Sequence, residues 1–466
     1  MAVKTRVDMT TGPIFSKLLV FSLPLIAINI INQLFHAADV AVVGIFADDF
    51  SVAAVSSTGA LTNLVIGLFT GLSVGANVLI AKYIGAKDLS KISKTVSTSI
   101  IFSIVAGVFL TLVFQLFTYQ FLTWMGSDPD VIDLATTYLK TYALGMPIVM
   151  LYTFGGAMLR AMGDSIRPMI FVLIGGVVNV ILNVVFVVGF NMVVEGVAIA
   201  TVVSNLISAV LMMIALFRKK DLFELKVKDI RFDKESFIEM VKIGVPSGIQ
   251  GMCFSLSNVI IQSTVNSFGD KLMTAQGASA QIEAFIYNIG NGVYLGTLPF
   301  VSQNYGARNY ERLKKIPFIA ILINLMLCIP ITILVLLFAR PLISIFTSTP
   351  EVQELALIRL FIICSIYFTC GIYEILSASM RGVGRSTSAM IITIFGTCIL
   401  RIIYVTLIFP TFTQNREAML YLIYPISWVV TSLILLSMLI PTYKRIKHMF
   451  KLKNNMDTNI RKTEQN

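Results

Sequence analysis

The amino-acid sequence predicts an all-α polytopic membrane protein with twelve transmembrane helices in two six-helix bundles that are related by a parallel internal repeat. Three observations predict this fold: an apolar composition, twelve apolar segments of spanning length, and a similarity between the two halves at an offset of about 221 residues. Of the 466 residues, 56% are hydrophobic and only 13% are charged. A soluble core does not absorb so much apolar surface.

The twelve apolar segments are each long enough to cross a bilayer as a helix. They lie at roughly 15 to 46, 52 to 80, 95 to 121, 131 to 158, 168 to 190, 194 to 217, 237 to 267, 273 to 300, 316 to 339, 352 to 379, 387 to 410 and 418 to 440. The N-terminus is too polar for a cleaved signal peptide, so we expect the first segment to remain as a span. Short polar or glycine-bearing links such as "ADDFS" and "FGDKL" join neighbouring spans.

The positions of lysine and arginine predict the orientation. With both termini in the cytoplasm, most of the 36 basic residues lie on the inner side, Arg401 lies inside a span, and five lie outside: Lys140, Lys271, Arg340, Arg359 and Arg416. This is the positive-inside pattern of a multi-pass protein, which we expect in the cell (plasma) membrane. The net charge of +11 therefore reflects topology, and we expect no nucleic-acid partner.

A long polar segment at the middle of the chain predicts the domain organisation. "FRKKDLFELKVKDIRFDKES" contains many charges and no apolar run. We therefore expect an N-terminal six-helix lobe at 1–217, a cytoplasmic linker at 218–236, a C-terminal six-helix lobe at 237–443 and a basic cytoplasmic tail at 444–466.

The two halves carry an internal repeat. "YIGAKDLSKISK" (83–94) resembles "NYGARNYERLKK" (304–315), and "LRAMGDS" (159–165) resembles "MRGVGRS" (380–386), both at an offset of 221. Pro24 and Pro246 correspond at an offset of 222. Because each half has an even number of spans, both halves enter from the same side of the membrane. Two parallel repeats that face a central cleft are typical of transporters.

Several motifs, in order along nearly the whole chain, resemble the multidrug and toxic compound extrusion (MATE) family. They are "SLPLI", "ADVAVVG", "GLSVGANVLIAKYIGAKD", "LRAMGDSIRP", "VSQNYGARN" and "SMRGVGRS". The resemblance implies cation-coupled efflux of drug-like, often cationic or amphipathic compounds by alternating access of two lobes, driven by H⁺ or Na⁺. It implies that the protein is a transporter and not an enzyme. Besides the coupling ion, we expect no cofactor. We expect a monomer whose partners are small-molecule drugs and membrane lipids.

Polar residues in the first span form one helical stripe. Asn29, Asn32 or Gln33, His36 and Asp39 are three and four residues apart, so they share a face that lipid cannot satisfy. An ionisable residue inside a span is expected to be functional. The resemblance implies that Asp39 is the cation-coupling carboxylate of the N-terminal lobe. His36 could relay a proton, although a packing role is favoured, and Gln33 and Asn32 could support the site.

The fifth span adds Asn179 and Asn183, one turn apart on one face. By the resemblance, Asn179 matches an asparagine that the family keeps near the first-span aspartate, whereas many relatives carry an aspartate at the position of Asn183. Asp39 is then the only carboxylate deep in the N-terminal lobe. This favours coupling to H⁺, while Na⁺ at Asp39 stays open because amide carbonyls can bind it. No other metal site is expected.

The C-terminal lobe contains further candidates. Some relatives place coupling carboxylates on spans 7 and 10, but span 7 here offers amides such as Gln250, and Glu374 does not match the family position. With Tyr367 and Tyr373 nearby, Glu374 is a candidate contact for a cationic substrate. Glu283 could serve substrate or structure, and Arg401 is the natural partner for either glutamate.

Two further arginines have a structural interpretation. Arg160 and Arg381 stand at inner helix ends, where a positive charge suits the helix dipole and lipid phosphate.

Two other functions agree less well with the sequence. "GLSVG" fits G-x-S-x-G, which would indicate a membrane-embedded hydrolase, but the only histidines are His36 and His448, and small residues that let helices approach closely explain the motif better. A flippase for lipids or lipid-linked saccharides, from a related fold, would predict a strongly basic cavity. Apart from Arg401, the spans contain almost no lysine or arginine.

Overall fold

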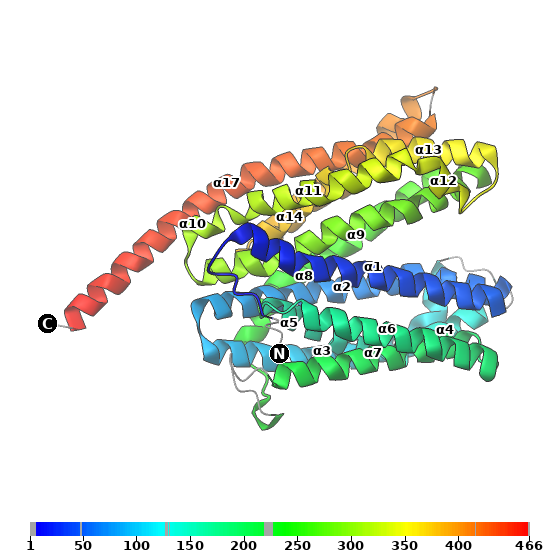
Figure 1. The fold of residues 1–466 in the computed structure, drawn as a ribbon. Helices are drawn as coiled ribbons and strands as arrows, with labels where there is room; N and C mark the ends of the chain where they lie inside the picture. The colour runs from blue at the N-terminus through cyan, green and yellow to red at the C-terminus, as the bar shows by residue number, and fades with distance from the viewer. Residues whose placement is uncertain are drawn as a thin grey trace. The chain divides into compact units, whose positions relative to one another are not determined.

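The computed structural model describes residues 6–46, 49–125, 129, 131–218, 227–414 and 416–464, and these form helices almost throughout. All twelve predicted spans coincide with helices, which confirms the all-α fold class (Figure 1). The first half contains α1 (Ile14–Phe46), α2 (Asp49–Ala86), α3 (Leu89–Trp124), α4 (Ile132–Leu144), α5 (Met146–Ala161), α6 (Ile166–Val184) with a π-helical end η1 (Val185–Gly189), and α7 (Val194–Phe217).

The second half repeats this order with more interruptions. It contains η2 (Val227–Asp229), α8 (Lys234–Asn266), α9 (Asp270–Gly306), α10 (Tyr310–Leu313), α11 (Ile316–Leu337), α12 (Ala339–Ser344), α13 (Pro350–Cys364), α14 (Phe368–Gly382), α15 (Ser386–Thr393), η3 (Ile394–Ile399), α16 (Leu400–Ile403), η4 (Tyr404–Ile408), η5 (Phe409–Thr411) and α17 (Arg416–Glu464). The last helix continues well past the predicted twelfth span and extends beyond its neighbours (Figure 1).

Length and hydropathy identify most of these helices as membrane spans. Within the described ranges, eight helices are long and apolar enough to cross a membrane, and ten spans result when each of two bent pairs counts as one. The bent pairs are α4 with α5, at 56°, and α13 with α14, at 43°. They correspond to the fourth and tenth predicted spans. The other two spans, α8 and α9, are long helices with more polar side chains.

Packing divides the chain into two compact units whose boundaries fall inside helices. Unit 1 holds the residues up to Val7, Pro24–Tyr83 and Asp88–Met252, and unit 2 holds Asp8–Leu23, Ile84–Lys87 and the chain from Cys253 onward. The predicted domain bounds place all of α1 in the N-terminal lobe and nearly all of α8 in the C-terminal lobe. In the structure the first part of α1, up to Leu23, packs with unit 2, and the first part of α8, up to Met252, packs with unit 1.

Glycine explains why these helix beginnings pack where they do. In unit 1, a Cβ atom on Gly71 of α2 would lie 2.3 Å from the Cα of Gly248 in α8, and one on Gly75 would lie 2.2 Å from the Met240 carbonyl oxygen. In unit 2, a Cβ atom on Gly296 of α9 would lie 2.4 Å from the Ser22 hydroxyl of α1. Gly75 and Gly296 are related by the repeat. The interpretation of "GLSVG" as a close-packing motif is confirmed.

Basic residues that follow the repeated "GAKD" and "GARN" sequences contact the chain at or just before the beginnings of the same two helices. In unit 2, the Arg312 guanidinium donates to the carbonyl oxygens of Met9 at 3.2 Å, Thr11 at 3.1 Å and Gly12 at 2.5 Å. In unit 1, Lys91, which the repeat relates to Arg312, lies 3.5 Å from Glu235 at the start of α8. Each loop therefore fixes the entry to a span with a basic side chain.

A buried ion pair joins α9 and α13 in unit 2. The Arg359 Nη2 atom lies 2.5 Å from Glu283 Oε2, and Nη1 donates to the Ser279 hydroxyl at 3.0 Å. Arg359 is only 5% exposed. The sequence prediction named Arg401 as the natural partner of Glu283, and this pairing is wrong, because Arg359 packs from α13 against α9 and binds the carboxylate. The prediction that Arg359 lies toward the outer side stays a prediction.

We predict that Gly75→Ala destabilises unit 1, because its methyl group would enter the space of the Met240 carbonyl. Overpacking of this kind costs about 1–3 kcal/mol. Thermal unfolding of the purified protein in detergent measures the effect. Gly67→Ala in the same helix is the matched control, because nothing lies within 4 Å of its added Cβ. Equal unfolding temperatures for the two variants would contradict the packing argument.

We predict that Arg359→Leu destabilises unit 2 strongly, by about 3–5 kcal/mol, because it leaves the Glu283 carboxylate buried without its partner. The double variant Arg359→Leu/Glu283→Leu should recover most of that loss, since it removes both charges together. Thermal unfolding of the two variants and the parent protein forms the comparison. A double variant no more stable than Arg359→Leu would show that the pair is not the source of the effect.

Candidate functional site

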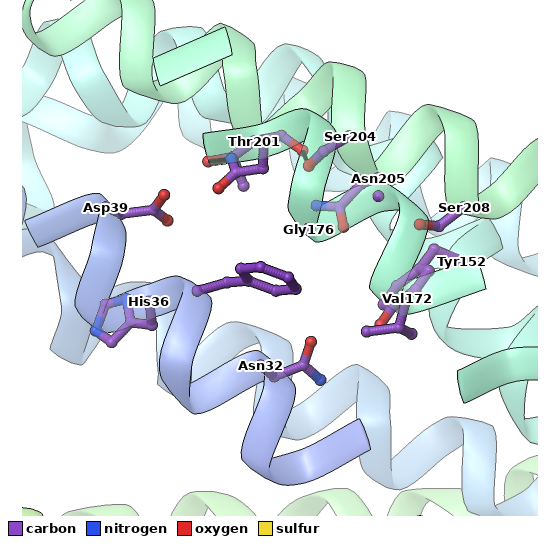
Figure 2. A pocket seen from close by; sticks show the side chains of 13 residues that line it. Asn32, His36, Asp39, Tyr152, Val172, Gly176, Thr201, Ser204, Asn205 and Ser208 are labelled. Atoms are coloured by element: carbon purple, nitrogen blue, oxygen red, sulfur yellow. Dashed lines mark hydrogen bonds between the residues drawn. The ribbon is translucent and has the colours of Figure 1, made fainter. Parts of the chain in front are cut away.

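A polar cavity of about 150 Å³ lies in unit 1 between α1, α5, α6 and α7 (Figure 2). Its lining comes from segments that are far apart in the sequence. The residues are Asn32, Phe35, His36 and Asp39 from α1, Tyr152 from α5, Val172, Gly175, Gly176 and Asn179 from α6, and Thr201, Ser204, Asn205 and Ser208 from α7. The fold thus gathers most of the predicted polar stripe and one of the two predicted asparagines around one space.

Asp39 has a single hydrogen-bond partner in the described part of the protein. The Asn183 side-chain amide donates to Asp39 Oδ1 at 2.5 Å, and Asn183 is fully buried. The same amide lies 3.4 Å from Asn179 Oδ1, and the Asn179 amide lies 3.4 Å from the Thr201 hydroxyl. A chain of neutral amide and hydroxyl groups therefore links the carboxylate to α6 and α7.

The charge of this carboxylate is not balanced by a basic side chain. No lysine, arginine or histidine in the described ranges forms an ion pair with Asp39. Asn183 Oδ1 is also buried, and no described residue donates a hydrogen bond to it. A carboxylate and an unused carbonyl oxygen, held a few ångströms apart by one amide, can accept either an added proton or a small monovalent cation. The site has the chemistry of reversible cation binding.

Two adjacent glycines shape the cavity. A Cβ atom on Gly176 would lie 1.6 Å from the Phe35 ring, and one on Gly175 would lie 2.2 Å from the Ser208 hydroxyl. Only glycine lets the Phe35 ring lie against α6 and lets α7 approach so closely. The cavity therefore combines an aromatic wall with the polar surface of α7.

The α7 part of the lining was missed by sequence reasoning. Thr201, Ser204, Asn205 and Ser208 stand at positions i, i+3, i+4 and i+7, which marks one helical face. This signal was present in the sequence, but hydroxyl groups are common in spans, where they hydrogen-bond their own helix, as the Ser204 hydroxyl does to the Thr201 carbonyl at 2.9 Å. Tyr152 was missed as well, since tyrosine and threonine recur along its span and nothing in the sequence distinguishes it from them.

The remaining predicted residues of the first span occupy different surroundings. His36 and Asn32 are exposed side chains that line the cavity, each about one turn from the next polar residue of the stripe (Figure 2). Gln33 does not line it and lies on a neighbouring face of α1. The predicted roles of these three side chains stay predictions.

None of the candidates in the second half is among the described residues that line this cavity. Glu374, Tyr373, Tyr367 and Glu283 belong to unit 2, whereas Gln250 belongs to unit 1. Tyr367 is buried and packs edge-on against Trp428, with ring centroids 5.0 Å apart. One carboxylate oxygen of Glu374 is buried without a partner among the described residues.

Arg160 and Arg381 occupy the last turns of α5 and α14, as predicted. Arg381 is only 5% exposed, and its Nη1 atom donates to the Tyr294 hydroxyl at 2.6 Å. The interpretation that Arg381 faces lipid phosphate is therefore wrong, because the side chain turns inward to α9.

Comparison with known proteins agrees with the duplicated fold. The chain is similar to solved structures entitled "Outward-facing conformation of a multidrug resistance MATE family transporter of the MOP superfamily" and "Crystal structure of MATE in complex with MaL6". Each has a TM-score of 0.88 and 23% identity, and each alignment covers 96% of this chain and 100% of the other. At this identity the likeness shows the fold.

Curated relatives and a family model show the family. The chain is 28% identical over 382 residues to the probable multidrug resistance protein YoeA of Bacillus subtilis (strain 168), covering 80% of this chain and 82% of YoeA. It is 25% identical over 395 residues to the multidrug export protein MepA of Staphylococcus aureus (strain MSSA476), covering 84% and 87%. The MatE family model matches twice, at residues 24–185 and 246–407, once in each repeat. The chain belongs to the MatE family of multidrug efflux transporters, and it is a multi-pass membrane protein.

Proposed function

We propose that this protein is a secondary active antiporter that exports drug-like, cationic or amphipathic compounds in exchange for H⁺, with Asp39 as the coupling group. The observation that carries the proposal is the isolation of Asp39: a carboxylate in a polar cavity with one amide partner and no described basic partner. Such a group gains charge neutrality by binding a cation. Exchange of that cation between the two sides of the membrane is what an antiporter requires.

The structure of the site supports H⁺ over Na⁺. Asp39 is the only carboxylate among the residues that line the cavity. A proton needs one carboxylate, whereas Na⁺ needs several oxygen ligands and is favoured by a second negative charge. Na⁺ is the second candidate, because Asn183 Oδ1 offers a carbonyl ligand beside Asp39.

Asn183 gives the cavity two ways to hold Asp39. Its amide donates to the ionised carboxylate, and its unpartnered carbonyl oxygen can accept the O–H of the protonated form if the amide group turns. The network through Asn179 and Thr201 would then reorganise with each proton bound or released. Coupling follows if the two arrangements favour different openings of the two lobes, because a ligand shifts a conformational equilibrium only by its difference in affinity for the two states.

The names of the relatives support the substrate class. YoeA and MepA are described as multidrug resistance or export proteins. The cavity joins an exposed histidine, amides and hydroxyls with the Phe35 ring, a surface suited to amphipathic molecules. We further propose that the protein works as a monomer in the plasma membrane with both termini in the cytoplasm. A lipid flippase is not favoured, since these relatives are named as drug exporters.

We predict that Asp39→Asn abolishes efflux of a cationic dye, because the amide cannot bind and release a proton. The expected loss is at least about tenfold in the initial efflux rate, with expression and thermal unfolding close to those of the parent protein. Asp133→Asn is the matched control, because Asp133 is an exposed aspartate in α4 of the same unit. Efflux by Asp39→Asn at the parental rate would reject Asp39 as the coupling group.

We predict that a pH gradient, acidic on the side that dye enters, drives dye uptake into proteoliposomes in the absence of Na⁺. The reason is that one carboxylate can carry the proton that exchanges for the dye. A Na⁺ gradient at equal pH on both sides should drive little uptake. Transport that follows the Na⁺ gradient and ignores the pH gradient would reject proton coupling in favour of Na⁺.

A further inference from the structure

Arg401 is a fully buried charge in unit 2 with an unusual backbone on both sides. Its side chain is 0% exposed. It lies on the single-turn helix α16, between the π-helical segments η3 and η4. Such segments are rare and are frequently found at functional sites, because they widen the helix and redirect side chains.

The contacts of Arg401 satisfy only part of its guanidinium group. Nε donates to the Ser427 hydroxyl at 3.0 Å, and Nη1 donates weakly to Asn258 Oδ1 at 3.4 Å. The rings of Tyr424 and Phe254 lie 4.6 and 5.4 Å from the guanidinium carbon. Nη2 is buried and has no acceptor in the described part of the protein.

Among the described residues, no acidic side chain compensates the charge of Arg401. Within the described ranges Arg401 forms no ion pair, and Glu283, its predicted partner, is bound to Arg359. Neutral dipoles and ring faces offset part of the cost of burying a cation, but a buried guanidinium ordinarily has a carboxylate or phosphate as its planar partner. The missing group is therefore an acceptor with negative charge.

The repeat places Arg401 where unit 1 has its cavity. At the offset of 222 that relates Pro24 to Pro246, the cavity residues Asn32 and His36 correspond to Phe254 and Asn258, both in contact with Arg401. At the offset of 221, Tyr152 corresponds to Tyr373, and Asn179 corresponds to Leu400, the residue before Arg401. Arg401 thus lies beside residues of unit 2 that correspond to part of the Asp39 cavity in unit 1.

The two regions have opposite charges. In unit 1 a carboxylate on α1 is held by an asparagine on α6. In unit 2 a guanidinium on α16 is held by an asparagine on α8. Phe254 and Asn258 of α8 are half-buried, whereas Arg401 itself is fully buried. A ligand that reaches Arg401 would pass these two side chains.

We propose that Arg401 is the centre of an anion-binding site in unit 2, which takes a small monovalent anion as its ligand. The anion is either a free inorganic ion such as chloride or the carboxylate of a zwitterionic substrate. The second source rests on the proposed function, because it requires that the protein bind drug-like molecules. The first source does not. Nη2 and Nη1 of Arg401 would donate to the anion, and Asn258, which already contacts Nη1, would lie next to it.

The first experiment measures anion binding by the purified full-length protein in detergent. Chloride replaces sulfate at constant ionic strength, and thermal unfolding is recorded for the parent, Arg401→Gln and Arg416→Gln. Arg416 is an exposed arginine of the same unit that stacks on Phe268 and Phe409, so its variant removes one charge away from the site. We expect chloride to raise the unfolding temperature of the parent and Arg416→Gln more than that of Arg401→Gln.

The second experiment tests the substrate carboxylate. Binding of a fluoroquinolone with a free carboxylate and of its methyl ester is measured by fluorescence anisotropy on the same three proteins. We expect the parent and Arg416→Gln to bind the acid at least about tenfold more tightly than the ester, as one charge-assisted hydrogen bond provides. In Arg401→Gln this preference should disappear.

The outcomes separate the two sources. If chloride stabilises the protein through Arg401 and the acid is not preferred over its ester, the ligand is an inorganic anion. If the acid binds more tightly than its ester and this difference depends on Arg401, the ligand is a substrate carboxylate. Responses in Arg401→Gln equal to those of the parent in both experiments would overturn the proposal. If Arg401→Gln does not fold, Arg401→Leu takes its place, because Arg401 forms no ion pair within the described ranges and its removal therefore leaves no described carboxylate buried without a partner. Both readouts measure binding without transport, so a failure of proton-driven efflux would not be mistaken for a failure of this site.

Discussion

Charged side chains inside a membrane span must be satisfied within the protein, since lipid offers no partner, and this constraint organises both units. Arg359 meets it with Glu283, and Arg381 meets it with the Tyr294 hydroxyl. Asp39 meets it only in part, through one amide. A side chain whose charge is fully paired stiffens the structure, and one whose charge is left unbalanced is available for a ligand. The degree of compensation therefore separates structural charges from candidate functional charges.

The second constraint is the close approach of helices at the ends of α1 and α8. Gly71 and Gly75 let α8 begin against α2, and Gly296 lets α1 begin against α9. These contacts are related by the repeat, and so are the basic residues Lys91, which contacts the first turn of α8, and Arg312, which contacts the chain ahead of α1. Both helices also contain a proline near the change from one unit to the other, Pro24 in α1 and Pro246 in α8. Each of the two helices therefore contributes residues to both units, and α1 carries Asp39 in the part that belongs to unit 1.

The sequence predicted the helices and the repeat, because hydrophobic length and recurring glycine, proline and arginine are local signals. The contact between Asp39 and Asn183 could also be anticipated, since a polar stripe on one span needs a polar partner on another. The partner of Glu283 could not. Arg359 and Arg401 are both compatible with a pair to Glu283, and only the packing of α13 on α9 decides between them. The lining from α7 could not be predicted either. A serine or threonine in a span can donate to a carbonyl of its own helix or face a cavity, and the sequence does not distinguish the two cases.

The duplication explains why the two units should differ in chemistry as well as agree in fold. A duplicated gene begins with two equal sites, and an antiporter that binds a cation and a drug needs two different ones. In this chain the first-half region has a carboxylate and amides, while the second-half region carries an arginine between aromatic rings. A ligand with a positive charge is attracted to the first and repelled by the second. On the two proposals above, unit 1 would bind the coupling cation at Asp39, and unit 2 would bind an anionic group at Arg401.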